Sequence, residues 1–347
     1  MTEKLKILVE MKHGLGDCIC AIPMLKVLRN NYPDSYIALV VNNHVNEELF
    51  RLSDIKINKF YYLSLKNRTL KDTIKLIFEL RNEKFDYGIL ATMTPKLKGK
   101  IFLSLLGIKN KIGEQYKNLS FFDLDDKKHF VERNLDLLKD ICDLPMSKIY
   151  PKIYEDKDFC NTIKVKYEII LKKQKIIGIC VGNGDISLYK GKKYFTRGWG
   201  IRNIKKLIEL LLHYEYTVFL FGGIQEKVLL GPLETVLNNK NVINFVGETT
   251  ITESATLVYL CDLVIGVDTG MQHIAAAIGT PTLSIFGPTN PKTHGAYAVN
   301  ASFIENPISC QYCFTNENYY ICEERKCLKG IMPEDVYSRA INILGKD

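Results

Sequence analysis

The stretch that decides the fold is Asp268-Thr-Gly-Met-Gln-His-Ile-Ala-Ala-Ala-Ile-Gly-Thr-Pro-Thr-Leu-Ser-Ile-Phe-Gly-Pro-Thr-Asn-Pro291. The residues before it, Leu263–Val267, are apolar and rich in β-branched side chains, which predicts a buried strand. Gly270–Ile278 predicts a helix, because its small alanines allow close packing and Gly279 stands where a C-cap is expected. Pro281 prevents the helix from continuing, and the apolar residues after it predict the next strand. The stretch is therefore a strand–turn–helix–strand unit.

The start of this predicted helix suits a phosphate or diphosphate. The first backbone N–H groups of a helix have no partner within it, and the helix dipole is positive at that end. Gly270 allows a ligand to approach the backbone closely, and Thr269 offers a hydroxyl. The alternative is that Asp268 and Thr269 only cap a structural helix, and local sequence does not decide between the two.

A second turn of this kind lies near the N-terminus. Leu5–Val9 predicts a strand, Lys12-His-Gly-Leu-Gly-Asp17 follows it, and Cys18–Asn30 predicts a helix. Ile19 replaces the third glycine of a dinucleotide-binding fingerprint, which argues against an NAD enzyme. Asp17 is a carboxylate at a helix N-terminus, where the dipole keeps it ionised. On these grounds alone we favour a helix-capping role for Asp17 over a catalytic one.

Both motifs resemble those of glycosyltransferase family 9, the ADP-heptose heptosyltransferases. The resemblance implies an α/β protein of the GT-B class, with two Rossmann-like domains facing a central cleft. It assigns the role of general base to Asp17, on the acceptor side with His13, Gly14 and Gly16. It implies an inverting transfer that needs no metal cofactor for catalysis.

The family resemblance also suggests a set of donor-binding residues in the second half of the chain. Gly222-Gly-Ile-Gln-Glu226 is similar to a family motif whose glutamate binds the nucleotide ribose, although Glu226 also fits an ordinary first-turn residue. Lys190–Trp199 joins cations and aromatics, which suits a diphosphate but also an ordinary basic surface loop. The family has a lysine two residues before the tryptophan, whereas Arg197 stands there in this sequence. The donor-binding candidates are Arg197, Lys193, Glu226, Asp268, Thr269, Gly270, Met271, His273 and Asn183.

The chain of 347 residues is long enough for two domains. Strand-like and helix-like segments alternate through both halves, as in parallel sheets covered by helices. Tyr150–Cys160 mixes Pro, Lys and Asp without apolar periodicity. We therefore expect an acceptor-binding domain over residues 1–160 and a nucleotide-sugar-binding domain over residues 161–347, with a C-terminal helix. Thr92–Lys100 predicts a basic loop, either an acceptor contact or a solvated connection.

The cysteines fall into two groups. Six lie in apolar segments, where we expect buried, inert thiols: Cys18, Cys20, Cys142, Cys160, Cys180 and Cys261. The other four, Cys310-x-x-Cys313 and Cys322-x-x-x-x-Cys327, lie close together in a polar loop. In a reducing compartment such spacing indicates a tetrahedral metal site more often than disulfides. Chemistry favours zinc, whereas resemblance to heptosyltransferases that modify autotransporter adhesins makes iron an alternative. The metal would be structural.

Composition limits the partners. The formal net charge of +8 favours an anionic substrate or membrane surface, and no nucleic-acid-reading motif is present. The N-terminus lacks signal-peptide features, so we expect a cytoplasmic protein with at most peripheral membrane contact. A homo-oligomer through the cysteine loop is compatible with the sequence.

We expect heptose transfer from ADP-heptose, with a preference for serine of an autotransporter adhesin as the acceptor because of the four-cysteine motif. The alternative acceptor is the lipopolysaccharide inner core on lipid A. Two further alternatives remain: another GT-B enzyme, such as a nucleotide-sugar epimerase, and a non-catalytic nucleotide-sugar-binding or assembly protein.

Overall fold

The fold is described from a computed structural model, in which the chain divides into two compact units, Met1–Lys152 and Ile153–Asp347. The structure describes residues 4–63, 69–92, 96–113, 128–166, 174–182, 187–189, 192–194, 197–315, 319 and 322–345. No helix in these ranges is both long and apolar enough to cross a bilayer.

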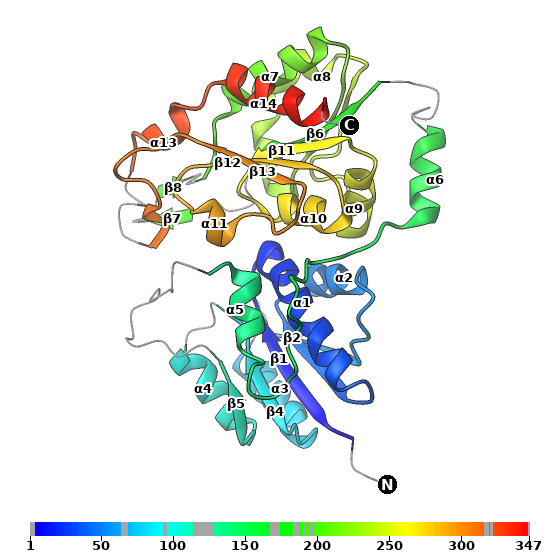
Figure 1. Ribbon diagram of the computed structural model, residues 1–347, viewed down its shortest axis with the longest axis vertical. Coiled ribbons are helices and arrows are strands. Elements are labelled where there is room, and N and C mark those ends of the chain that lie inside the picture. The colour runs from blue at the N-terminus through cyan, green and yellow to red at the C-terminus, as the bar shows by residue number, and fades with distance from the viewer. Residues whose placement is uncertain are drawn as a thin grey trace. The chain divides into compact units, whose positions relative to one another are not determined.

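The first unit is a parallel sheet with helices on both faces (Figure 1). Its strand order is β3-β2-β1-β4-β5, and every neighbouring pair is parallel. The elements in chain order are β1 (Lys6–Met11), α1 (Leu15–Asn31), β2 (Tyr36–Val41), α2 (His44–Arg51), β3 (Lys59–Tyr62), α3 (Leu70–Asn82), β4 (Tyr87–Leu90), α4 (Lys96–Leu105), β5 (Asn110–Ile112) and α5 (Phe130–Asp136).

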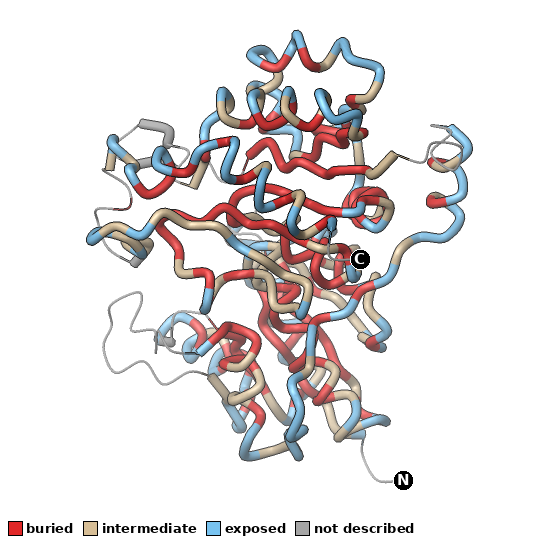
Figure 2. Tube along the Cα trace, turned by 45° about the horizontal axis from the view of Figure 1, so that its top comes forward, coloured by how far each residue is buried: buried red, intermediate tan, exposed pale blue. Residues whose placement is uncertain are grey.

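The central strands of this sheet are buried on both sides, so their sequences are continuously apolar rather than alternating (Figure 2). Leu8 of β1 and Val40 of β2 pack under α3 and α4, which contribute Leu80 and Leu103 to the same core. The β1 backbone therefore lies at the centre of the unit. This position fixes the turn from β1 to α1 at the carboxyl edge of the sheet.

The second unit repeats the architecture with strand order β10-β9-β6-β11-β12-β13, again parallel throughout. A separate antiparallel pair joins β7 to β8. Its elements are α6 (Lys157–Lys166), β6 (Ile176–Cys180), β7 (Ser187–Tyr189), β8 (Lys192–Tyr194), α7 (Ile201–His213), β9 (Thr217–Phe221), η2 (Ile224–Leu229), η3 (Gly231–Leu233), α8 (Glu234–Leu237), β10 (Val242–Asn244), α9 (Ile251–Tyr259), β11 (Leu263–Val267), α10 (Gly270–Ile278), β12 (Thr282–Phe286), α11 (Pro291–His294), β13 (Ala301–Glu305), η4 (Cys313–Thr315), α13 (Lys326–Lys329) and α14 (Pro333–Leu344).

The C-terminal helix α14 completes the second unit. It packs against α7, where the rings of Tyr337 and Tyr214 stack with centroids 5.3 Å apart. The ammonium of Lys175 donates to the carbonyl of Leu344 over 2.8 Å, which ties the end of the helix to the start of β6. The strand–helix–strand unit predicted from the deciding stretch is present as β11, α10 and β12, and Gly279 ends α10 with a φ of 99°, in the left-handed region.

The structure corrects two predictions of local structure. The expected basic loop at Thr92–Lys100 is a helix from Lys96 onward, and packing of Leu103 in the core stabilises it; residues 93–95 lie outside the described ranges. Helix α1 begins at Leu15 rather than Cys18, which places Asp17 inside its first turn. Of the six cysteines expected to be buried, Cys142 is only half-buried.

Candidate functional site

Asp17 is presented at the carboxyl edge of the first unit's sheet. Its carboxylate Oδ2 accepts the backbone N–H of Gly14 over 3.2 Å, an arrangement in which Gly14 is the N-cap of α1. The side chain is only partly buried. The structure thus confirms the capping contact, and because a carboxylate has two oxygens, that contact does not occupy the whole group.

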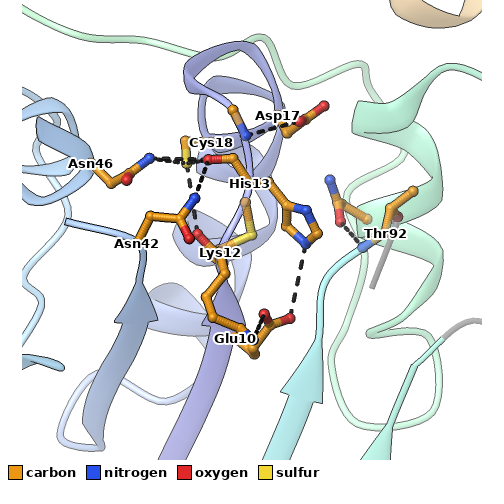
Figure 3. A network of polar contacts seen from close by, with 11 residues as sticks. Glu10, Lys12, His13, Asp17, Cys18, Asn42, Asn46 and Thr92 are labelled. Carbon is orange, nitrogen blue, oxygen red and sulfur yellow. Dashed lines mark hydrogen bonds and ion pairs between the residues drawn. The ribbon is translucent and has the colours of Figure 1, made fainter. Parts of the chain in front are cut away.

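A buried carboxylate lies beneath this turn. Glu10, at the end of β1, is 2% exposed, and its two oxygens lie 3.5 Å from the Lys12 ammonium and 3.9 Å from Nε2 of His13 (Figure 3). A buried carboxylate is stable only with such partners. Glu10 therefore orients His13 from below. The sequence analysis did not select Glu10, although a charged residue in the apolar run Ile7–Met11 is a detectable signal.

The loop before Asp17 is held from the side by two asparagines. The side-chain amides of Asn42 and Asn46 donate to the carbonyl of His13 over 3.3 and 3.2 Å (Figure 3). Asn46 also donates to the Cys18 thiol over 3.2 Å. Burial raises the pKa of Cys18 above its ordinary value, so this thiol stays protonated and serves as packing.

A neighbouring strand adds one further polar group. The backbone N–H of Thr92, just after β4, donates to the Asn134 side chain of α5 over 3.0 Å. Thr92 is 4% exposed, and among the described residues its hydroxyl has no hydrogen-bond partner. Thr92 begins the stretch Thr92–Lys100 that the sequence analysis considered as an acceptor contact, but a long-range contact leaves no short motif, so sequence reasoning could not select Asn134.

In the second unit, Asp268 is held by two side chains. It follows β11, is 6% exposed, and its Oδ2 accepts from the Thr289 hydroxyl over 2.8 Å and from Nη1 of Arg197 over 3.1 Å. Burial raises the pKa of Asp268, but the positive charges of Arg197, His273 and His294 outweigh it, so that the pKa lies below the ordinary aspartate value. The carboxylate is therefore ionised at neutral pH.

The anion site predicted from the sequence falls at the N-terminus of α10. Thr269 is the N-cap in an extended conformation, and its side chain makes no capping hydrogen bond, so the hydroxyl is available to a ligand. Thr269, Gly270 and Met271 are partly exposed, whereas His273 is 7% exposed beneath them. The first-turn N–H groups of this nine-residue helix can receive an anion.

Glu226 lies at the carboxyl ends of β6 and β9. Its carboxylate Oε2 accepts the N–H of Gly223 over 2.7 Å, and the residue is 6% exposed. A Cβ built on Gly182, just after β6, would lie 1.9 Å from Oε1, so only glycine leaves room for this carboxylate. Glu226 lies in the first turn of η2, which is a short 3-10 helix rather than an α-helix.

A cavity of about 320 Å³ opens at the same edge of the second sheet. The ends of β6 and β11 contribute Gly182 and Val267, and the start of α7 contributes Gly200 and Ile201. Arg325 is the cationic side chain among the described residues that line it. Its selection from sequence was not possible, because it comes from a loop about 60 residues further along the chain than Val267.

The four-cysteine loop presents Arg325 to this cavity. The backbone N–H of Arg325 donates to Sγ of Cys322 over 3.3 Å, and its Nε donates to the carbonyl of Cys322 over 3.3 Å. Arg325 has a φ of 44°, in the left-handed region that favours glycine. Cys322 therefore holds the strained backbone of Arg325 and orients its side chain.

Two thiols of this loop have raised pKa values. The pKa of the Cys327 thiol is raised by burial and by the charges of Cys313, Cys322 and Cys310, and the pKa of Cys313 is raised by burial, Cys322 and Cys310. Even so, no group of three or more His, Cys, Asp or Glu side chains in the described part of the chain has the geometry of a metal site. Cys327 and Leu328 also pack against Gly287, just after β12.

Two predicted donor-binding residues cannot be placed. Asn183 and the side chain of Lys193 lie outside the described residues, although the backbone of Lys193 belongs to β8. Arg197 is placed, but on Asp268 rather than in the open cavity. Trp199, two residues on, is buried and donates to the carbonyl of Ile331 over 2.9 Å.

Two parallel α/β units, each with polar side chains at the carboxyl edge of its sheet, are typical of doubly wound folds, which bind their ligands at that edge. The profile of glycosyltransferase family 9 (heptosyltransferase) matches residues 73–322, more than half of the 347-residue chain. The chain belongs to this family. The expected glycosyltransferase class and the GT-B fold class are confirmed.

Several similar proteins are named as heptosyltransferases of lipooligosaccharide or lipopolysaccharide. Lipooligosaccharide heptosyltransferase 2 of Campylobacter jejuni is 25% identical, and the alignment covers 98% of both chains. The structure of E. coli ADP-heptose LPS heptosyltransferase II has a TM-score of 0.75 at 20% identity and covers 99% of both. The iron-containing dodecameric glycosyltransferase TibC of enterotoxigenic E. coli reaches 0.57 at 12% identity and 78% of its length. These likenesses favour the alternative acceptor over the adhesin that the cysteine motif suggested.

Proposed function

We propose that the protein transfers heptose from ADP-heptose to a sugar hydroxyl of the lipopolysaccharide or lipooligosaccharide inner core. The family and the names of its similar proteins support this substrate class. The observation that carries the reaction is the partly exposed carboxylate of Asp17, which one backbone N–H orients at the start of α1. The carboxylate is therefore held in place and is still accessible to an acceptor hydroxyl.

The proposed reaction is a direct displacement with inversion. Asp17 accepts the proton of the acceptor hydroxyl while the oxygen of that hydroxyl bonds to the anomeric carbon of heptose. The bond from that carbon to the diphosphate oxygen breaks at the same time, and ADP departs with the electron pair. Transfer requires the acceptor hydroxyl bound at Asp17 to reach the anomeric carbon of the donor sugar. His13, Gly14 and Gly16 would line the acceptor side.

We propose that the second unit binds ADP-heptose at the carboxyl edge of its sheet. The first-turn N–H groups of Thr269, Gly270 and Met271 would bind the diphosphate, and the negative charge that develops on ADP would be stabilised there. Glu226, buried against Gly182, would accept hydrogen bonds from the ribose hydroxyls. The role of Arg197 is to fix Asp268, so we add Arg325 as the cation that meets the diphosphate in the cavity.

We also propose a structural role for the loop cysteines. Cys310, Cys313, Cys322 and Cys327 have the ligand number and softness for zinc or iron, and their spacing in the sequence supports this assignment. A bound ion would fix the loop that carries Arg325. No catalytic step passes through it.

The test is transfer by the purified chain, followed by intact mass. ADP-heptose is offered in parallel with a lipid A–Kdo acceptor and a serine-rich adhesin fragment. We expect a heptose-sized increment on the lipid acceptor only, and none with Asp17→Asn. An increment on the adhesin fragment alone would show that the acceptor is a protein rather than the lipid. If neither acceptor gains heptose and ADP-heptose is not consumed, the proposed function is wrong.

A further inference from the structure

Two helices of the first unit expose large apolar side chains to solvent. On α3, Phe78 is 62% and Ile74 is 45% exposed; on α4, Leu97, Ile101 and Leu105 are 56%, 51% and 48% exposed. Residues four apart lie on one side of a helix, so these form one stripe along each helix. Single exposed apolar residues are ordinary, whereas two aligned stripes are not.

The opposite side of each helix is already used for packing. Leu76 and Leu80 of α3 and Leu103 of α4 belong to one buried core, which covers one face of the sheet. The two helices are also tied at their ends, since Nη1 of Arg81 donates to the carbonyl of Leu105 over 3.3 Å. Figure 1 places them beside β4 and β5. The stripes therefore belong to one rigid part of the unit and face away from its core.

Cations border the stripes. Together α3 and α4 contain six lysine or arginine residues and two acidic ones. At 100° per residue, Lys98 and Lys100 flank the α4 stripe on opposite sides, and Lys71 and Lys75 lie beside that of α3. All four are exposed, and no ion pair is recorded for them in the described part of the chain. The acidic residues are engaged: Asp72 caps α3 through Thr69, and Glu79 pairs with Lys59.

We propose that α3 and α4 form the surface by which the protein binds an anionic phospholipid membrane. An apolar stripe bordered by lysines suits the membrane interface, where apolar side chains enter the acyl boundary and ammonium groups meet phosphates. A protein partner fits less well, because protein interfaces are depleted in lysine. The exposed Lys109 and Lys111, at β5 after α4, extend the positive charge.

This surface would place the protein where a lipid-linked acceptor lies. It rests on exposure and charge, and not on Asp17 or on the donor site. Vesicle binding can therefore fail while transfer to a soluble acceptor persists, and transfer can fail while vesicle binding persists.

The test is cosedimentation of the full chain with vesicles. One set is phosphatidylcholine alone, and the other contains phosphatidylglycerol in addition. We expect binding to the anionic vesicles that weakens as salt rises, because a membrane surface potential is screened within a Debye length. Equal binding to both vesicle types, or binding to neither, would overturn the proposal.

Two pairs of variants assign the binding to the helices. Phe78→Ser with Ile101→Ser should lower vesicle affinity at least about tenfold, and Lys98→Gln with Lys100→Gln about fivefold per lysine. Matched controls on exposed residues of the second unit, Val228→Ser with Val299→Ser and Lys206→Gln with Lys240→Gln, should bind as the parent does. Thermal unfolding checks that all variants fold. If the apolar pair instead dissociates a dimer and leaves vesicle binding unchanged, the surface is a self-association face and the proposal is wrong.

Discussion

Asp17 and Asp268 both belong to a connection from a strand to a helix at the carboxyl edge of a sheet: Asp17 lies in the first turn of α1, and Asp268 lies between β11 and α10. Their surroundings differ. Asp17 is partly exposed and accepts one backbone N–H, whereas Asp268 is buried and bonded to Arg197 and Thr289. The same fold element thus presents one carboxylate to reactants and uses the other to shape a binding site. Only the first can exchange protons with a substrate.

The largest effect should come from the exposed carboxylate. Asp17→Asn removes the base, and we expect turnover to fall by about 10²–10⁴. The amide oxygen of Asn can still accept the Gly14 N–H, so helix α1 should form normally. Steady-state transfer and far-UV circular dichroism measure the two properties. Asp140→Asn, exposed in the same unit, serves as the control, and near-parental turnover of Asp17→Asn would exclude it as the base.

Removing the partner of the buried Asp268 carboxylate should mainly lower the stability of the protein. Arg197→Gln leaves Asp268 without its principal counter-charge, and we expect a loss of about 3–5 kcal/mol in the free energy of unfolding at pH 7. Because the folded pKa of Asp268 is depressed, its stabilising contribution is present above the ordinary aspartate value and is lost as pH falls through the folded value. The difference between Arg197→Gln and the parent should therefore shrink below about pH 4.

Urea unfolding at several pH values measures this difference. Arg202→Gln, exposed on α7, is the matched control and should unfold like the parent. If Arg197→Gln costs no stability at pH 7, the two aspartates would not differ as we describe.

A smaller effect should come from the ribose pocket. Gly182→Ala places a Cβ against Oε1 of Glu226, so the carboxylate must move, and we expect ADP affinity to fall by about tenfold. Gly231→Ala adds a Cβ into open space and should leave ADP affinity unchanged. Isothermal titration calorimetry with ADP measures the affinity of both variants. Equal affinities for the two variants would remove Glu226 from the donor site.

Sequence reasoning succeeded where the signal is local. The strand–helix–strand unit around Gly270–Ile278 and the C-terminal helix Pro333–Leu344 follow from apolar periodicity and from glycine or proline at their ends. It failed at α4, because Gly99 suggested a loop, whereas packing of Leu103 in the core stabilises a helix. It also could not foresee Glu10 as a buried partner of His13, since that role depends on the folded turn rather than on spacing.

Arg325 shows most directly what spacing cannot predict, and it gives the smallest expected effect. The cysteine loop brings it to the cavity edge by contacts that exist only in the folded chain. Because its φ of 44° lies in the left-handed region, Arg325→Gly removes the cation while relieving backbone strain. We therefore expect ADP affinity to fall about threefold to tenfold while the unfolding temperature holds or rises. A loss of stability with unchanged affinity would instead mean that Arg325 serves only the structure of the loop.

Two further variants test this assignment. Lys329→Gln, exposed on α13, controls for the loss of a positive charge. Cys322→Ser should also weaken ADP binding, because it releases the backbone that orients Arg325.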